Sequence, residues 1–252
     1  MTRTRLIPLD GCHNLRDLGG YPASHGVTAW GRVLRADSLH RLTPDTMAHL
    51  RGLGCTDVID LRNEDELGFQ PNPFAAGHPG IRYHNISLLG ELDPTRTDLF
   101  DAPDVLLELY CRALADCGPR LAEVLRLIAG ARGTVVFHCT AGKDRTGLIA
   151  AFLLLLAGVR RSDIVADYAL TARQAPAMFA DLHRELEAGG RNFDPASPLL
   201  ASNAATMEAF LHHLAIIHGG AETYLRTNGL SDADITALRT RMLHRDLTEG
   251  AA

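Results

Sequence analysis

The sequence lacks several features that would mark a particular class of protein. Its 252 residues hold 25 Lys plus Arg against 30 Asp plus Glu, which gives a formal charge of −5. A general nucleic-acid binder usually carries a basic face, so we expect no nucleic-acid partner. The longest apolar stretch, residues 148–159, is too short to span a bilayer, so we expect no stable membrane insertion.

Signals for export and for disulfide bonding are also missing. Residues 1–6 lack the apolar core of a signal peptide, so we expect the cytoplasm by default, and export without a cleaved signal stays open. The five cysteines form no Cys-x-x-Cys pair, which argues against a disulfide framework or a zinc ribbon. They are Cys12, Cys55, Cys111, Cys117 and Cys139. The oligomeric state has no signature in the sequence.

Strand and helix signals alternate along the chain. Short apolar segments predict strands at about residues 32–35, 55–61, 82–86 and 134–137. Helical spacing of apolar side chains predicts helices at about residues 44–53, 104–117, 119–129, 145–157, 162–173, 176–188, 203–218, 220–228 and 231–247. This alternation indicates an α/β fold, a small sheet flanked by helices, with a helical C-terminal part. We expect residues 1–252 to form a single domain.

The segment that carries chemistry is residues 138–147, His-Cys-Thr-Ala-Gly-Lys-Asp-Arg-Thr-Gly. It lies between a predicted buried strand and a predicted apolar helix, so its backbone N–H groups and the helix N-terminus form an anion cradle. Arg145 follows Cys139 by six residues, and its planar guanidinium can hold two oxygens of a phosphate. The same positive field favours the thiolate of Cys139.

This Cys-x5-Arg segment resembles the signature of the cysteine-dependent protein tyrosine phosphatase superfamily. Residues 14–20, 35–39 and 60–66 resemble segments of one bacterial branch, some members of which also act on phosphoinositides. The resemblance implies a tyrosine phosphatase-like fold, with Cys139 as the nucleophile that forms a phosphocysteine and Arg145 as the phosphoryl-binding residue.

The resemblance also implies roles for the neighbours of these two residues. The loop residues expected to bind phosphate are Thr140, Ala141, Gly142, Lys143, Asp144 and Arg145. His138 would orient the loop, and Thr146 would donate to the sulfur as it leaves. Neither a metal nor another cofactor is expected, because Arg145 and the backbone amides neutralise the phosphate charge. Lys143, the only lysine in the chain, would add a mobile charge at the rim and favour multiply phosphorylated substrates.

The general acid has more than one candidate. The tyrosine-specific members of the superfamily place an Asp after a Trp-Pro pair, but the only tryptophan here, Trp30, precedes Gly31. We favour Asp144, because an acid inside the loop can protonate the leaving oxygen directly. The upstream alternatives are Asp93, Asp98, Asp101 and Asp104. Supporting roles are expected for Arg16 and Asp17, which would tie the N-terminal segment to the loop, and for Asp60 at the end of a strand.

These residues predict a phosphomonoesterase acting on phosphotyrosine, with phosphoserine, phosphothreonine and phosphoinositides as further candidates. The partner would be a phosphorylated protein or a phosphoinositide. The alternative is a rhodanese-like sulfur transferase or an arsenate reductase, for which Cys12 is the nearby second thiol. Apolar side chains in residues 176–188 and 203–218 fit a face packed on the core. The resemblance instead implies a helical lid within residues 176–218, hinged at Gly189 and Gly190.

Overall fold

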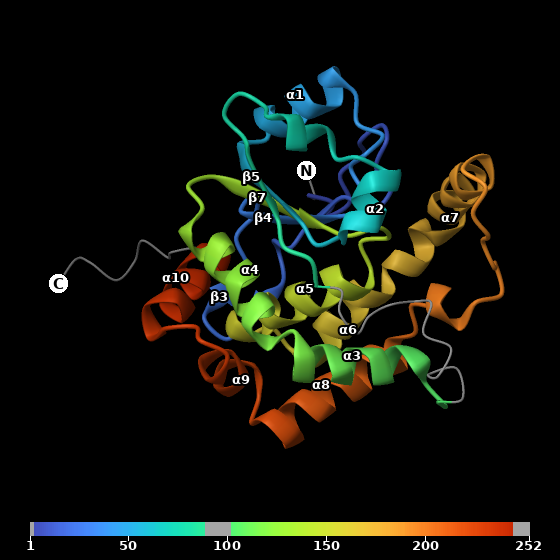
Figure 1. Cartoon of the computed structure of the whole chain (residues 1–252). Helices are drawn as coiled ribbons and strands as arrows, with labels where there is room; N and C mark the ends of the chain where they lie inside the picture. Colours follow the sequence, from blue (N-terminus) through green and yellow to red (C-terminus); the bar gives the residue numbers. More distant parts are fainter. Residues whose placement is uncertain (1–2, 89–101, 244–252) are drawn as a thin grey trace.

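The computed structural model describes residues 3–88 and 102–243. Its centre is a five-stranded sheet in the order β1-β4-β7-β5-β6 (Figure 1). The strands are β1 Arg16–Asp17, β4 Val33–Ala36, β5 Cys55–Asp60, β6 Arg82–Asn85 and β7 Thr134–His138. The four strands β4, β7, β5 and β6 run parallel to one another, and β1 is antiparallel to β4. A separate two-stranded ribbon joins β2 Pro22–Ala23 to β3 Gly26–Val27.

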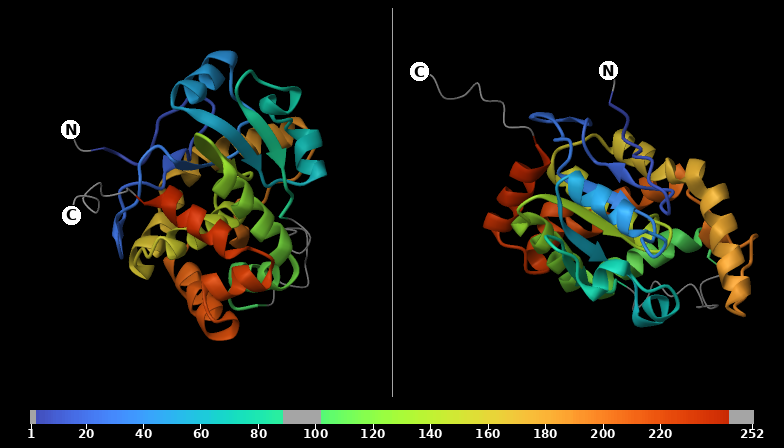
Figure 2. Two further views of the ribbon diagram at one scale, coloured as in Figure 1. Left: turned by 90° about the vertical axis from the view of Figure 1, so that its left-hand side faces the viewer. Right: turned by 90° about the horizontal axis from the view of Figure 1, so that it is seen from above.

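The sheet is buried on both faces because its central strands carry apolar residues on both sides. Leu34, Val58 and Val136 pack with Leu50 of helix α1 (Pro44–Gly52). The alternate residues Val33, Ile59, Val135 and Phe137 pack into the larger helical core on the other face. Figure 2 shows α1 lying over the strands in the view from above. Burial on both faces is typical of parallel sheets and explains their nearly continuous apolar sequence.

Helix α5 (Asp144–Leu156) is the centre of the helical layer. Eleven of its thirteen residues are buried, so its apolar sequence reflects packing on all sides rather than a membrane span. Its neighbours include α4 Gly118–Gly130, α6 Arg161–Ala169, α9 Ala221–Thr227 and α10 Asp232–Met242. Helices α3 (Val105–Asp116) and α8 (Ala204–His218) pack on each other beside this layer (Figure 1). The predicted α/β fold with a helical C-terminal part is confirmed.

Two local predictions differ from the structure. Residues 171–188 form one helix, α7, in which Pro176 lies inside, whereas the sequence predicted a break between residues 173 and 176. Proline removes one hydrogen bond to the carbonyl four residues earlier, and both Ala172 and Pro176 are exposed, so water can satisfy that carbonyl. Helix α2 (Glu64–Phe69) was not predicted, although Asn63 and Glu66 form the capping box that begins it.

Two short 3-10 helices complete the described elements: η1 Pro73–Ala76 and η3 Pro198–Leu200. The helix expected at 231–247 is observed as α10, but it ends at Met242, because Leu243 is extended and pairs with Thr28. Residues 244–247 lie outside the described residues.

Candidate active site

Residues 139–143 form a loop between the end of β7 and the start of α5, at the carboxyl edge of the parallel strands. Gly142 has φ +62°, and a Cβ there would lie 2.4 Å from the carbonyl oxygen of Ala36. Only glycine tolerates this combination of a left-handed conformation and a close backbone approach. Gly142 therefore fixes the turn of the loop backbone, with Cys139 at the start of the loop and Arg145 in the first turn of α5.

Side chains from distant segments hold the loop carbonyls. Asn14 Nδ2 donates to the carbonyl of Ala141 at 3.0 Å, and Arg35 Nη2 donates to that of Gly142 at 2.8 Å. The backbone N–H of Ser38 donates to the carbonyl of Thr140 at 2.9 Å. Because these carbonyls are engaged from behind, the loop amides are left to face an anion.

The loop is supported by a buried network around Asp167. Arg35 Nη1 and Arg16 Nε contact the carboxylate of Asp167 at 2.5 and 3.1 Å. Burial, with the nearby charge of Arg16, lowers the pKa of Arg35 to about 10. Arg16 also donates to Asn14 Oδ1 at 2.5 Å, so it reaches the loop through Asn14.

Asp17, by contrast, lies away from the loop. Its carboxylate accepts hydrogen bonds from the backbone N–H of Gly19 at 2.8 Å and of Gly31 at 2.7 Å. The prediction that Asp17 ties the N-terminal segment to the phosphate-binding loop is wrong. Its side chain organises the turn residues of its own segment, which the sequence pattern could not distinguish from a contact with the loop.

His138 is held by a second buried group. Its Nε2 lies 2.9 Å from Asn72 Nδ2 and 3.3 Å from Asp60 Oδ2, and its Nδ1 lies 3.1 Å from the carbonyl oxygen of Cys139. Arg62 contacts Asp60 Oδ2 at 2.7 Å. Burial alone would raise the pKa of Asp60, but His138 and Arg62 outweigh it and hold the pKa well below its ordinary value. Asp60 thus fixes the imidazole that precedes Cys139.

The guanidinium of Arg145 is paired with Glu66, a residue to which we assigned no role from the sequence. Nη1 contacts Oε2 and Nη2 contacts Oε1, each at 2.7 Å. Thr140 Oγ1 donates to the same carboxylate. Burial opposes the charged forms, yet the pair keeps the pKa of Arg145 above and that of Glu66 below its ordinary value. The capping box on α2, which places Glu66, is the sequence signal that could have pointed to it.

Asp144 lies at the start of α5 and faces another unpredicted residue. Its Oδ1 accepts a hydrogen bond from the hydroxyl of Tyr110 at 2.5 Å and lies 3.3 Å from Lys143 Nζ. Of the upstream alternatives, Asp104 caps α3 by accepting from the backbone N–H of Leu107 at 3.0 Å and from Thr206 Oγ1 at 2.7 Å. Asp93, Asp98 and Asp101 lie outside the described residues.

Lys143 and Thr146 are both buried. Lys143 Nζ donates to the carbonyl of Ala201 at 2.6 Å and to that of Leu199. It is therefore not the exposed, mobile charge that the sequence suggested, because the chain following α7 covers it. The hydroxyl of Thr146 is a buried group without a hydrogen-bond partner in the described part of the chain, and Cys139 is only 2% exposed.

A cavity of about 190 Å³ lies against the loop. Its polar lining includes Glu66, Thr140, Lys143, Asp144 and Arg145, and the loop residue Ala141 also contributes. Its apolar lining comes from three segments: Leu106, Leu109 and Tyr110 of α3, Phe179 and Leu182 of α7, and Leu199 and Leu200 of η3. Side chains of α7 and η3 thus stand over the residues predicted to bind phosphate.

The two helical parts of the predicted lid are placed differently. α8 carries Met207, Phe210, Leu211 and Leu214, all buried, and packs on α3 and α6; it is part of the core. α7 has only Thr171 and Met178 buried and projects beyond the helical layer (Figure 1). Of the range 176–218, only the α7 and η3 segments stand over the loop.

Polar contacts attach α7 to the N-terminal half of the chain. Asp181 Oδ2 lies 2.7 Å from His13 Nε2. Three side chains converge on the carboxylate of Glu185: His40 at 2.9 Å, Arg41 at 3.2 Å and Gln70 at 2.5 Å. The side chains of Glu185, His40 and Arg41 are partly exposed, so each of these ion pairs stabilises the closed position of α7 only modestly.

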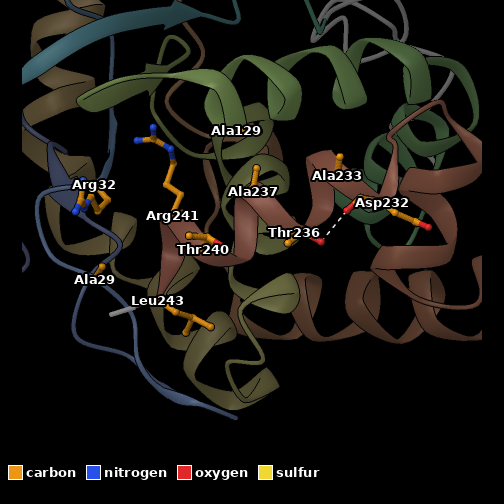
Figure 3. Close-up of a pocket in the computed structure, with 10 residues that line it drawn as sticks. All are labelled: Ala29, Arg32, Ala129, Asp232, Ala233, Thr236, Ala237, Thr240, Arg241 and Leu243. Carbon is orange, nitrogen blue, oxygen red and sulfur yellow. Dashed lines mark hydrogen bonds between the residues drawn. The ribbon is translucent and has the colours of Figure 1, made fainter. Parts of the chain in front are cut away.

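A larger cavity lies elsewhere. It has a volume of about 990 Å³, and Figure 3 shows that one face of α10 lines much of it, with Arg32 and Arg241 at one end. Most of its other lining side chains are Ala or Thr, and none belongs to the loop at 138–147. The larger cavity is therefore not the one that the predicted phosphate-binding residues line.

The described residues were also expected to contain neither a membrane-spanning helix nor a metal site. No helix in residues 3–88 and 102–243 is both long and apolar enough to cross a membrane. The same residues contain no group of three or more His, Cys, Asp or Glu that could hold a metal ion.

The chain is similar to known tyrosine phosphatases. Residues 7–244 match the family described as "Tyrosine phosphatase family". A tyrosine-protein phosphatase of Nostoc commune is 36% identical over 216 residues, which cover 83% of this chain and 73% of the relative. A putative tyrosine-protein phosphatase of Cupriavidus necator is 29% identical, covering 94% and 88%. The triple specificity protein phosphatase PtpB of Mycobacterium tuberculosis is 27% identical, covering 93% and 98%.

The family match extends over the Cys139–Arg145 loop and over nearly all of the described structure. Together with the relative from Nostoc commune, it shows that the chain belongs to the tyrosine phosphatase family and is a phosphatase enzyme.

Proposed function

We propose that this enzyme hydrolyses phosphomonoesters at the loop 138–147, with Cys139 as the nucleophile. The observation that supports the proposal is that Thr140, Ala141, Lys143, Asp144 and Arg145 line one cavity of about 190 Å³. Cys139 directly precedes them at the start of the same loop. A phosphate there would meet the N-terminus of α5 and the Arg145 guanidinium on one side. The sulfur would attack phosphorus from the floor of the loop.

Arg145 binds the phosphoryl oxygens, and Glu66 orients it. Glu66 engages both terminal nitrogens of the guanidinium, so the side chain is held in one rotamer before substrate arrives. Nε–H is not used by these contacts and is available to a phosphate oxygen. Orientation of this kind reduces the entropy that must be lost on reaching the transition state.

Asp144 acts as the general acid in this proposal. It lines the cavity together with Arg145, and its side chain is 28% exposed, so it can reach a leaving oxygen. In the first step the thiolate of Cys139 attacks phosphorus while Asp144 protonates the departing oxygen. In the second step Asp144 accepts a proton from the water that attacks phosphocysteine, and the thiolate leaves. Thr146, whose buried hydroxyl has no hydrogen-bond partner among the described residues, would donate to that sulfur as it leaves.

Substitution of the two central residues tests the nucleophile. Cys139→Ser should abolish turnover while keeping affinity for orthovanadate, whereas Arg145→Ala should lose both affinity and rate. Purified protein would be assayed with p-nitrophenyl phosphate without added metal. Turnover by Cys139→Ser above a few per cent of the unmodified enzyme would contradict the proposal.

The leaving group tests the acid. Asp144→Asn should lower kcat/KM by about 10²- to 10⁴-fold for phenyl phosphate, and by much less for p-nitrophenyl phosphate, whose leaving group needs little protonation. An equal loss with both substrates would show a structural role for Asp144. The candidates outside the described residues, Asp93, Asp98 and Asp101, would then be substituted in turn.

The redox alternative finds little support in the surroundings of the second thiol. Cys12 is buried, and its Sγ donates to Asp37 Oδ1 at 2.7 Å. Burial and the neighbouring carboxylate raise the pKa of this thiol, which disfavours the thiolate that an arsenate reductase would need.

The substrate range is proposed to extend beyond phosphotyrosine. One relative is named a triple specificity phosphatase, and the cavity combines an apolar lining with the Lys143 ammonium. That ammonium is bound by the carbonyls of Leu199 and Ala201, so a second phosphate could reach it only after this segment moves. Lys143→Ala should then lower kcat/KM for a phosphoinositide more than for a phosphotyrosine peptide. Equal losses would remove the case for a lipid preference.

The segment of α7 and η3 is proposed to be a lid. It covers the cavity with Phe179, Leu182, Leu199 and Leu200, and its attachments to the N-terminal half are partly exposed polar contacts. Substrate would enter when α7 moves away, with Gly189 and Gly190 at its end as the hinge.

A further inference from the structure

Behind Asp144 lies a chain of two buried tyrosine hydroxyls. The hydroxyl of Tyr110 donates to Asp144 Oδ1 at 2.5 Å and lies 2.7 Å from the hydroxyl of Tyr168. Tyr110 comes from α3 and Tyr168 from α6, so the three residues meet only in the folded protein. Tyr110 is fully buried and Tyr168 is 1% exposed.

The direction of this chain follows from the number of protons. A phenol has one proton to donate. If Tyr110 gives its proton to Asp144, the short contact with Tyr168 requires Tyr168 to be the donor to Tyr110. The hydroxyl of Tyr168 makes no other hydrogen bond within the described residues, so this direction leaves no donor unused. Each bond of such a chain polarises the next.

The two oxygens of Asp144 consequently differ. Oδ1 faces two donors, Tyr110 and the Lys143 ammonium at 3.3 Å. Oδ2 makes no hydrogen bond or ion pair in the part of the chain that the structure describes, and the carboxyl group lines the cavity. A proton on Oδ1 would compete with both donors, so a protonated Asp144 carries its proton on Oδ2.

We propose that Tyr110, backed by Tyr168, is a positioning residue that selects Oδ2 of Asp144 as the atom which exchanges protons with the substrate. This inference rests on the proposed role of Asp144 as general acid. In phosphocysteine formation the S–P bond forms, the P–O bond breaks, and the Oδ2 proton passes to the leaving oxygen. In hydrolysis the attacking water returns a proton to Oδ2 as the S–P bond breaks. Oδ1 keeps its hydrogen bond from Tyr110 in both states.

The surroundings of Tyr110 suit this task. Its ring packs edge-on against Phe210 and Tyr168, with ring centroids 5.9 and 6.3 Å away, so the hydroxyl cannot swing away from Asp144. Burial, reinforced by the charge of Asp144, raises the pKa of Tyr110 well above its ordinary value. The phenol therefore stays protonated and remains a donor throughout turnover.

Tyr110→Phe tests the proposal because it removes one hydroxyl and keeps the ring. We expect kcat/KM for phenyl phosphate to fall about tenfold more than kcat/KM for p-nitrophenyl phosphate, as for the loss of one hydrogen bond to a charged group. The affinity for orthovanadate should stay unchanged. Tyr168→Phe should give a smaller loss of the same kind, since Tyr110 still reaches Asp144.

Two further variants make the result specific. Tyr224→Phe is the matched control, because Tyr224 is another buried tyrosine whose hydroxyl donates to the carbonyl of Leu114, outside the cavity. It should leave the ratio between the two substrates unchanged. In an Asp144→Asn background, Tyr110→Phe should add no further leaving-group-dependent loss.

The outcomes separate the two ideas. If Asp144→Asn shows the leaving-group dependence and Tyr110→Phe affects both substrates equally or neither, Tyr110 does not position Asp144, and the acid assignment stands. If Asp144→Asn itself affects both substrates equally, the acid assignment and the role of Tyr110 are both wrong. A leaving-group effect of Tyr110→Phe that persists undiminished without Asp144 would also overturn the proposal.

Discussion

Removing one carboxylate from α7 should expose the nucleophile. Glu185 is the residue on which the attachments of this helix converge. Cys139 is only 2% exposed, and the loop residues that follow it line the cavity that α7 covers. We expect Glu185→Ala to increase the rate at which iodoacetamide alkylates Cys139, because the open position of the lid becomes more populated.

The contacts of Glu185 set the size of the effect. His40, Arg41 and Gln70 approach its carboxylate at 2.9, 3.2 and 2.5 Å. Its side chain is 30% exposed, so each contact is worth about 0.2–1 kcal/mol. Their loss together shifts the opening equilibrium by about 1–2 kcal/mol, which raises the open fraction about 5- to 30-fold.

The assay compares pseudo-first-order alkylation rates of the native enzyme, Glu185→Ala and a control. Glu187→Ala is the matched control, because Glu187 lies on the same helix but pairs only with His183 one turn away, among the described residues. Loss of p-nitrophenyl phosphatase activity would follow the modification, and excess orthovanadate should protect Cys139. Alkylation at the rate of the native enzyme in both variants would refute the reasoning that these contacts hold a lid closed.

Three other substitutions have defined outcomes. Glu66→Gln should lower kcat/KM about tenfold or more through loss of a charge-assisted bond to Arg145, whereas Glu64→Gln on the same helix should not; steady-state kinetics decide. Asp60→Asn should cost about 3–5 kcal/mol at neutral pH by breaking a buried ion pair. Because the pKa of Asp60 is held below its ordinary value, this stabilisation is present above the unfolded-state pKa of about 4 and is lost as the pH falls through the folded-state pKa. Urea unfolding of both proteins at pH 7 and pH 3 should therefore show a smaller difference in the free energy of unfolding at pH 3. A difference that stays constant would contradict this prediction. Gly142→Ala should cost at least about 1–2 kcal/mol for its positive φ, plus the displacement of a backbone carbonyl, and a melting temperature within a degree of the native value would contradict this.

Local signals in the sequence predicted much of the secondary structure. Thr43 and Pro44 begin α1 as expected from capping, since the cap and the first turn are neighbours in the chain. The loop 138–147 likewise contains its own strand end, turn glycine and helix start, so its place between a strand and a helix could be predicted from ten consecutive residues. The α/β alternation was also evident, because each element carries its own apolar periodicity.

The partners of the loop could not be read in this way. Glu66 lies 79 residues before Arg145, and Tyr110 lies 34 residues before Asp144. The capping box could have marked Glu66 as a helix-start residue, but nothing in the spacing of such distant residues shows that they contact Arg145 and Asp144. Asp17 shows the opposite error. Its place in a family-like segment suggested a contact with the phosphate-binding loop, but its carboxylate instead accepts hydrogen bonds from the backbone N–H groups of Gly19 and Gly31.

The sequence by itself therefore determined the class of fold and pointed to the loop at 138–147, since the signals for both lie within short segments of the chain. Only the tertiary structure decided how that chemistry is controlled. It buries Lys143 under the carbonyls of Leu199 and Ala201, places α7 over the cavity, and sets Tyr110 behind Asp144. The physical reason is that the burial and the charge neighbours of a side chain are set by segments remote in sequence, which meet only when the helices pack on the sheet.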